Sequence, residues 1–265
     1  NIAIGISKLF LSKKHYYIFT QHEIPSLNPF FTNWRGFYMP FLMRIFYSNA
    51  DKVVCVSKGL EQEIKRILNF KIKNKITTIP NCIEINNSTD SNSISSPYLR
   101  LLSVGRLVSS KDYNSLIEAV KIIKDEINVK LTIVGEGPQK SVLENLIKQF
   151  ALSEIISIKD FENEIEYYYS KSDIYISTSL YESFGNTIVE AMHFNLNIIS
   201  TDCDYGPREI LENGKWGSLI ELSSPEAIVE SIKNITKKKI QNNYSKVLKK
   251  YSSQTILKLY EDLNI

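Results

Sequence analysis

The sequence predicts an α/β protein built on doubly wound parallel sheets. Short apolar runs alternate with segments of helical spacing along most of the 265 residues, and this alternation is typical of βαβ units. Glycine and charged residues follow directly after several of the apolar runs. Sheets of this class bind ligands outside the carboxyl ends of their strands, so these residues are the first candidates for a functional site.

Composition excludes several other classes of protein. The 32 basic and 29 acidic residues leave a formal charge of +3, which is too small to indicate a nucleic-acid partner. Cys55, Cys82 and Cys203 stand far apart, as expected of reduced thiols in a cytosolic protein rather than of a disulfide framework. The three histidines have no metal-ligand spacing, and no apolar run reaches transmembrane length. We therefore expect a cytoplasmic protein without a metal.

The first strand is predicted at residues 16–20, and His22 follows it. A histidine just past a strand end is well placed for a ligand cleft. A histidine that caps a loop explains the same position equally well.

An aromatic segment occupies residues 26–49, with Trp34 and Phe37 among its apolar positions at helical spacing. A helix packed on the core explains most of this pattern. The excess of aromatic residues together with Arg35 and Arg44 also suits a helix at a membrane surface.

A strand at 52–56 leads to Ser57, which is expected to cap a helix over 58–69, and a further strand follows at 76–79. The polar segment 86–97 lacks periodicity and reads as a linker. We expect one domain over 1–92, a second over 93–250 and a final helical segment over 251–265.

Regular alternation of strands and helices follows the linker. The predicted strands are 99–104, 130–134, 155–158, 173–177, 196–200 and 217–220, and the predicted helices are 113–125, 138–150, 164–170, 186–194, 207–213, 225–237, 240–251 and 254–263.

The stretch 177–191 organises the second domain. Gly185 and Asn186 lie where a helix should begin, and a helix start binds anions through its unpaired N–H groups and its dipole. Glu190 lies about one turn into this helix. A carboxylate there would repel a phosphate but suits neighbouring hydroxyls, such as those of a ribose.

Two cations follow the strand at 99–104. Arg106 comes after Gly105, and Lys111 comes five residues later; such a pair suits a diphosphate. A solvated basic loop is the alternative. Gly135 and Gly137 are a weak signal of a ligand site, because a tight turn before a proline-started helix explains them. Segment 206–209 is explained equally well by a ligand role and by a loop that caps a helix.

These motifs together resemble the retaining, group 1 glycosyltransferases (glycosyltransferase family 4, GT-B fold). The resemblance rests on Y-E-S-F-G-N-T-I-V-E-A-M at 181–192, V-G-R-L at 104–107 with Lys111, V-G-E-G-P at 134–138 and G-P-R-E-I-L-E-N-G-K-W-G at 206–217. It implies two Rossmann-like domains facing across a cleft, the N-terminal one truncated, with a last helix returning to that domain.

The resemblance also implies roles for individual residues. Arg106 and Lys111 would hold the donor's phosphates, Glu190 the ribose, Glu182 the transferred sugar, and His22 would lie near that sugar. The implied catalytic residues are Glu182, Arg106, Lys111 and His22. The implied donor-binding residues are Gly105, Arg106, Lys111, Gly135, Phe161, Glu182, Phe184, Gly185, Asn186, Thr187 and Glu190.

The implied activity is that of a retaining, metal-independent hexosyltransferase without a cofactor. It would use a nucleotide-sugar, expected to be a UDP-sugar, and a glycan or lipid-linked acceptor in polysaccharide or lipopolysaccharide synthesis. The protein would be cytoplasmic, with the inner face of the membrane as a candidate surface. The alternatives are a non-catalytic nucleotide-sugar-binding module and another GT-B enzyme such as an epimerase.

Overall fold

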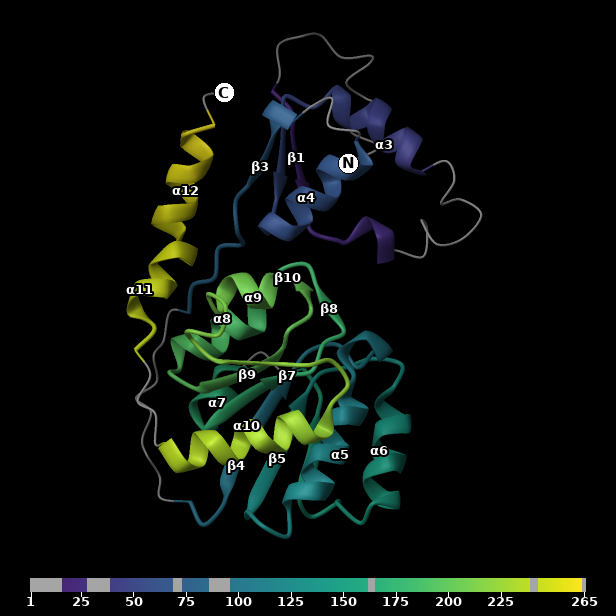
Figure 1. Ribbon diagram of the computed structural model, residues 1–265, viewed down its shortest axis with the longest axis vertical. Helices are drawn as coiled ribbons and strands as arrows, with labels where there is room; N and C mark the ends of the chain where they lie inside the picture. Colours follow the sequence, from purple (N-terminus) through teal and green to yellow (C-terminus); the bar gives the residue numbers. More distant parts are fainter. Residues whose placement is uncertain are drawn as a thin grey trace. The chain divides into compact units, whose positions relative to one another are not determined.

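A computed structural model describes residues 16–27, 39–68, 73–85, 96–161, 165–238 and 243–263 (Figure 1). The chain divides into two compact units. The N-terminal unit comprises 1–82, 182–184 and 250–265, and the C-terminal unit comprises 83–181 and 185–249. The division after Cys82 precedes the stretch 86–97 that reads as a linker.

The N-terminal unit contains a three-stranded parallel sheet in the order β1-β2-β3. Its strands are β1 (Ile18–Gln21), β2 (Lys52–Cys55) and β3 (Ile76–Thr78). Val53, Val54 and Cys55 are fully buried, as expected of a central strand covered on both faces.

Helices flank this sheet. They are η1 (Pro25–Leu27), α3 (Met39–Ser48), α4 (Lys58–Ile67), η3 (Lys73–Lys75) and α12 (Ser253–Glu261). Ser57 caps α4 as predicted, because its side chain accepts a hydrogen bond from the N–H of Leu60. Ile256 and Leu263 pack with Val54 and Ile79, so the end of the chain completes the core of the N-terminal unit.

The C-terminal unit contains a six-stranded parallel sheet in the order β11-β9-β7-β4-β5-β6. Its strands are β4 (Leu99–Val104), β5 (Val129–Val134), β6 (Ile156–Lys159), β7 (Ile174–Ser177), β9 (Asn197–Thr201) and β11 (Ser218–Ile220). The predicted α/β class with parallel sheets is therefore confirmed.

Successive side chains along each strand point to opposite faces of the sheet, and each face is covered by its own layer of helices. Ile174 and Ile176 of β7 belong to the apolar core under α5, α6 and α10, whereas the ring of Tyr175 points to the layer of α7 and α8, where it contacts Tyr169. The helices of this unit are α5 (Tyr113–Ile123), α6 (Lys140–Gln149), α7 (Ile165–Ser170), α8 (Asn186–His193), α9 (Gly206–Ile210), α10 (Pro225–Lys238) and α11 (Ser245–Leu248) (Figure 1).

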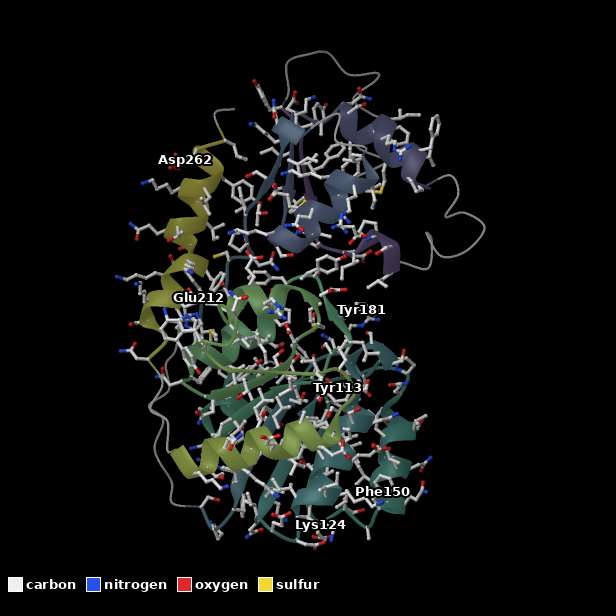
Figure 2. All side chains as sticks on the ribbon, viewed as in Figure 1. Tyr113, Lys124, Phe150, Tyr181, Glu212 and Asp262 are labelled. Carbon is white, nitrogen blue, oxygen red and sulfur yellow. The ribbon has the colours of Figure 1, made fainter. Side chains whose placement is uncertain are left out.

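The described residues also include the short elements η4 (Ser109–Lys111), β8 (Tyr181–Glu182), β10 (Asp204–Tyr205) and η5 (Lys249–Tyr251). Helix α5 runs from Tyr113, near the carboxyl ends of the strands, towards Lys124 at the opposite edge of the sheet, where Phe150 also lies (Figure 2).

The order of strands reverses between β4 and β7. From β4 the sheet grows through β5 and β6, and from β7 it grows in the other direction through β9 and β11. The carboxyl ends of two such neighbouring strands form the switch point of a doubly wound sheet, where ligands of this fold class bind.

Several predicted helices differ from the structure in their ends; the one predicted at 207–213, for example, ends at Ile210. The predicted helix at 138–150 begins instead at Lys140, because residues 137–139 turn against the loop after β4, where the N–H of Gln139 bonds the carbonyl of Leu107. A single helix over 240–251 is wrong, since α11 ends at Leu248 and a 3₁₀ turn follows.

Helix α3 accounts for part of the aromatic segment. Met43, Phe46 and Tyr47 are buried, whereas Phe41 is 60% and Ile45 39% exposed. Trp34 and Phe37 lie outside the described residues. The part of the segment over 39–48 is thus a helix packed by one face, with Phe41 and Ile45 exposed.

Candidate nucleotide-binding site

Lys111 lies across Gly105 at the carboxyl end of β4. A Cβ atom on Gly105 would stand 3.5 Å from Cε of Lys111 and 3.2 Å from the hydroxyl of Tyr113. That hydroxyl donates a hydrogen bond to the carbonyl of Gly105 over 3.1 Å. Arg106, the next residue, is exposed. The predicted cation pair therefore flanks one glycine at the switch point.

The loop that carries Lys111 is held on both sides. The N–H of Leu180, in the loop after β7, bonds the carbonyl of Ser110 over 2.8 Å. Asp112 has a left-handed backbone (φ 44°), and its carboxylate accepts hydrogen bonds from Ser115 (2.7 Å) and Ser223 (2.8 Å). The backbone on either side of Lys111 is thus held by neighbouring segments.

Gly135 and Gly137 are required by a close approach of two loops. A Cβ atom on Gly135 would stand 1.9 Å from the carbonyl oxygen of Gly105, and one on Gly137 would stand 2.4 Å from that of Leu107. The N–H of Gly105 bonds the carbonyl of Val134 (3.0 Å). These glycines therefore let the loop after β5 lie directly against the loop of the cations, a more specific reason than the tight turn that the sequence indicates.

Helix α8 begins at Asn186, as the sequence predicts, with Gly185 as its N-cap at a φ of 108°. This left-handed conformation favours glycine. Asn186 is exposed, and the hydroxyl of Thr187 accepts a hydrogen bond from the Tyr175 hydroxyl over 2.6 Å. The start of α8, with its positive dipole end, follows β7 at the switch point.

Glu190 is half-buried and paired with a tyrosine. The hydroxyl of Tyr169 in α7 donates a hydrogen bond to Oε2 of Glu190 over 2.7 Å. Burial raises the pKa of the Glu190 carboxyl above its ordinary value, the hydrogen bond from Tyr169 opposes this, and the charge of Glu166 adds to it. Burial also raises the pKa of Tyr169, so its phenol stays a neutral donor.

An aromatic cluster surrounds that tyrosine. The Tyr169 ring stacks on Phe194, with centroids 5.4 Å apart and planes 10° apart, and lies 6.0 Å from Tyr175. Sequence reasoning missed Tyr169 and Tyr175 as site residues. Tyrosine within apolar segments indicates only core packing, and nothing in the local sequence shows which distant group its hydroxyl meets.

Three predicted residues belong to the N-terminal unit. Phe184 is only 4% exposed, and its ring packs edge-on against Tyr251 with centroids 5.6 Å apart. Glu182 is half-buried, and His22 is exposed directly after β1. The side chain of Phe184 is therefore part of a core, which leaves only its backbone for a ligand.

Phe161 lies in the loop after β6 and is 61% exposed. Asp160, beside it, pairs with Lys140 at the start of α6. This ion pair links the loop after β6 to α6, the helix that follows Gly135 and Gly137. Glu162, the next residue after Phe161, lies outside the described residues.

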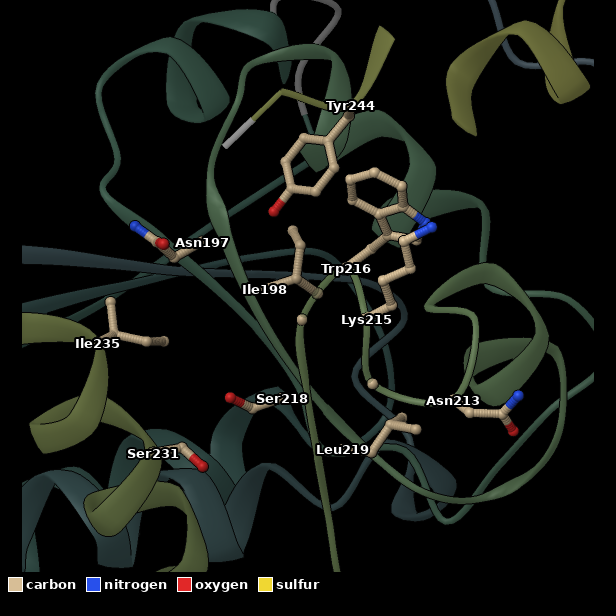
Figure 3. A pocket seen from close by; sticks show the side chains of 12 residues that line it. Asn197, Ile198, Asn213, Lys215, Trp216, Ser218, Leu219, Ser231, Ile235 and Tyr244 are labelled. Atoms are coloured by element: carbon tan, nitrogen blue, oxygen red, sulfur yellow. The ribbon is translucent and has the colours of Figure 1, made fainter. Parts of the chain in front are cut away.

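A pocket of about 460 Å³ lies elsewhere in the C-terminal unit (Figure 3). Asn197 and Ser218, the first residues of β9 and β11, line it together with Lys215, Trp216 and Tyr244. It therefore opens at the amino ends of the strands, the edge opposite the switch point, and none of the predicted donor-binding residues lines it.

Two features are absent from the part of the chain that the structure describes. No helix there is long and apolar enough to span a membrane. Among the same residues, no group of three or more histidine, cysteine, aspartate or glutamate side chains is placed to hold a metal ion.

Comparison with protein families gives two matches that together span most of the chain. Residues 84–255 match the model described as glycosyl transferases group 1. Residues 4–87 match the model described as Glycosyltransferase Family 4.

Comparison with curated proteins finds similar bacterial enzymes. The chain is 26% identical over 256 residues to N-acetylgalactosamine-N,N'-diacetylbacillosaminyl-diphospho-undecaprenol 4-alpha-N-acetylgalactosaminyltransferase of Campylobacter jejuni, covering 89% of this chain and 68% of the relative. It is 28% identical over 233 residues to the amylovoran biosynthesis glycosyltransferase AmsD of Erwinia amylovora, covering 83% of this chain and 64% of the relative. The chain thus spans about two thirds of the length of these relatives.

Solved structures show the same fold. The Anabaena protein HepE, solved in complex with UDP and glucose, aligns with a TM-score of 0.81 at 18% identity, over 99% of this chain and 74% of HepE. At this identity the likeness shows the fold alone. With the parallel sheets described above, it confirms the predicted GT-B fold class.

Proposed function

The chain belongs to the group 1 glycosyl transferases, and from this premise we propose that it transfers a sugar from a UDP-sugar to a glycan or lipid-linked acceptor. The transfer retains the configuration at the sugar's anomeric carbon and needs neither a metal nor a cofactor. UDP is bound by HepE, and a diphospho-undecaprenol acceptor is named for the Campylobacter relative, which supports these choices of donor and acceptor.

One observation carries the proposal. At the switch point of a single parallel sheet, cations after β4 lie beside a helix start and a carboxylate after β7: Lys111 across Gly105, Arg106 next to it, and Glu190 in α8. Cations and a helix N-terminus suit a diphosphate. A carboxylate one turn further suits the hydroxyls of a ribose. The combination therefore fits a nucleoside diphosphate better than either part would alone.

The same groups would promote the reaction. Negative charge grows on the diphosphate as its bond to the sugar breaks, through an oxocarbenium-like state. Arg106, Lys111 and the N–H groups at the start of α8 would stabilise this charge as preorganised groups, which is usually the largest single contribution to catalysis. Roles for Glu182 and His22 toward the transferred sugar rest on the family resemblance.

Calorimetric titration with UDP, with GDP for comparison, tests the donor site. Replacing Glu190 with alanine should weaken UDP binding at least about tenfold, because a hydrogen bond to a charged group contributes about 1.5–3 kcal/mol. Glu118→Ala, at an exposed glutamate of α5, is the matched control and should bind UDP as the wild type does. Equal binding by both variants would remove Glu190 from the site.

The chemical step has its own tests. Transfer from a UDP-sugar in the presence of EDTA checks independence from a metal. Proton NMR of the product's anomeric configuration checks retention, and an inverted product would contradict the proposal. UDP binding without transfer to any lipid-linked or glycan acceptor would favour the non-catalytic module, whereas conversion of the UDP-sugar without an acceptor would favour an epimerase.

Contact with a membrane surface is part of the proposal, since a lipid-linked acceptor lies there. The exposed apolar side chains Phe41 and Ile45 of α3 are candidates for this contact. Their double replacement by serine should lower co-flotation with anionic liposomes. Leu257→Ser, at a 61% exposed position of α12, is the control, and unchanged flotation of the double variant would count against α3.

A further inference from the structure

The carboxylate of Glu190 is held by a side chain that comes from a different helix. Tyr169 lies 21 residues earlier, in α7, and its hydroxyl donates to Oε2 of Glu190 over 2.7 Å. Tyr169 is completely buried, whereas Glu190 is half-buried. One oxygen of the carboxylate thus accepts a hydrogen bond from a buried tyrosine, while the glutamate side chain as a whole is partly exposed.

The packing of its ring fixes where that hydroxyl lies. The Phe194 ring stacks on the Tyr169 ring with centroids 5.4 Å apart, and the centroid of the Tyr175 ring lies 6.0 Å from that of Tyr169. Tyr175 in turn bonds Thr187 at the start of α8 over 2.6 Å. Since close-packed interiors leave little room for ring movement, the core places the hydroxyl, and the hydroxyl then places the carboxylate.

Recognition of two neighbouring hydroxyls depends on such a fixed carboxylate. An unconstrained glutamate side chain samples many rotamers, and ordering it when the ligand binds costs free energy. A neutral phenol that donates to a carboxylate also favours its ionised form, which accepts hydrogen bonds from sugar hydroxyls. Both effects act on Glu190 before a nucleotide arrives.

We propose that Tyr169 is a positioning residue, which orients Glu190 toward the ribose hydroxyls and thereby sets the preference for ribonucleotides over 2′-deoxyribonucleotides. This inference rests on the proposed function, in which Glu190 binds the ribose. It assigns the preference to a tyrosine that does not itself touch the nucleotide.

Tyr169→Phe tests the inference, because it removes one hydroxyl and keeps the stacked ring. Calorimetry on the full chain gives the dissociation constants of UDP and 2′-deoxy-UDP. The readout is the dissociation constant of 2′-deoxy-UDP divided by that of UDP, which is large when the protein prefers the ribonucleotide. We expect the variant to bind UDP about 2- to 10-fold more weakly, as for loss of a single hydrogen bond, and to discriminate less against the deoxynucleotide.

Tyr244→Phe is the matched control. Tyr244 is also a buried tyrosine, whose hydroxyl donates to the carbonyl of Leu196 over 2.9 Å. It lines the pocket at the opposite edge of the sheet (Figure 3). Its replacement should cost similar stability, measured by thermal unfolding, and leave the ratio of dissociation constants unchanged.

The outcomes separate the inference from the function on which it rests. If Glu190→Ala weakens UDP binding and Tyr169→Phe keeps the wild-type ratio, the inference is overturned and the proposed function stands. If Glu190→Ala changes nothing, the proposed ribose site itself fails. An equal change in the ratio of dissociation constants in Tyr169→Phe and Tyr244→Phe would also overturn the inference, because it would follow from the general loss of stability that the two variants share.

A second variant covers the case in which Tyr169→Phe does not fold. Phe194→Leu removes the stacking partner and retains the Tyr169 hydroxyl. We expect a smaller fall in the ratio than in Tyr169→Phe, and a wild-type ratio in a folded Phe194→Leu protein would overturn the inference.

The pH dependence gives a readout that structural damage would not produce. Glu166 of α7, Tyr175 of β7 and Tyr113 of α5 are the titratable groups that interact with this pair, and burial raises the pKa of Tyr169 itself. Without the Tyr169 donor, the Glu190 carboxylate should take up its proton at higher pH. The ratio of variant to wild-type affinity for UDP should therefore fall as the pH is lowered; a constant ratio would contradict this.

Discussion

The hydroxyl of Thr178 donates a hydrogen bond to the backbone carbonyl of Lys111 over 2.7 Å. The two residues follow different strands, β7 and β4, and stand 67 positions apart in the sequence. The bond therefore joins the loops on the two sides of the switch point, the loop of the cations and the loop that leads to α8.

Thr178→Val should loosen this join. The carbonyl of Lys111 would lose its donor within a buried site, since Thr178 is 2% exposed, and stability should fall by about 1–3 kcal/mol. UDP affinity should fall by a few-fold because Lys111 is less well held. Thr236→Val in α10, which loses a bond to the carbonyl of Lys233, should leave UDP affinity unchanged.

The contact between the two glycine loops predicts a large effect of a single methyl group. Gly135→Ala would place Cβ 1.9 Å from the carbonyl oxygen of Gly105, so we expect a loss of about 2 kcal/mol or more in urea unfolding. At Gly214, where φ is 90° and the nearest atom would be 3.7 Å away, alanine should cost about 1 kcal/mol from backbone strain. Equal costs would contradict the steric reason.

The phosphate and ribose contacts can be separated with two nucleotides. Lys111→Ala should weaken the binding of UDP about tenfold or more, as for loss of a charged hydrogen bond. It should weaken the binding of UMP less, because UMP lacks the second phosphate. Glu190→Ala should weaken the binding of both nucleotides to the same extent. Lys148→Ala, at an exposed lysine of α6, is the control for charge. A Lys111→Ala variant that weakens UMP as strongly as UDP would contradict the assignment to the diphosphate.

Burial of Glu190 should make stability depend on pH. Since burial raises the pKa of this carboxyl in the folded protein, the folded state binds the proton more tightly than the unfolded chain. Stability from this group is present at low pH and declines as the pH rises through the interval between the ordinary and the raised pKa.

Glu190→Gln removes this titration, so the variant should gain stability relative to the wild type as the pH rises from acidic to neutral. Urea unfolding at a series of pH values measures the difference. A difference that is constant with pH, or that changes in the opposite direction, would contradict it. The variant should bind UDP less well even where it is more stable, because a charged acceptor has been lost.

The sequence was sufficient to predict the strands of the six-stranded sheet in the C-terminal unit. Strand β4 and the start of α8 lie where they were predicted, because apolar runs and a glycine before a polar helix start act over a few residues. The start of α6 was predicted at Pro138 and lies at Lys140, because contact with Leu107, far away in the sequence, outweighed the local signal for a proline-started helix.

The candidate site was predictable as a set of charged residues but not as a geometry. Arg106, Lys111 and Glu190 belong to motifs and carry charge, so they stand out in a sequence. Tyr169 and Thr178 act through hydrogen bonds to residues 21 and 67 positions away, and only the folded chain brings these partners together.

The division of the chain into units also bears on how such proteins can be recombined. Each unit is discontinuous in sequence: the N-terminal one includes 182–184 and 250–265, and the C-terminal one is interrupted by that three-residue segment. A chimera with a single crossover would separate Ile256 and Leu263 from the core they share with Val54. Exchange of residues 83–249 between relatives would therefore need two junctions, with segment 250–265 retained by the recipient, and would carry residues 182–184 of the N-terminal unit along.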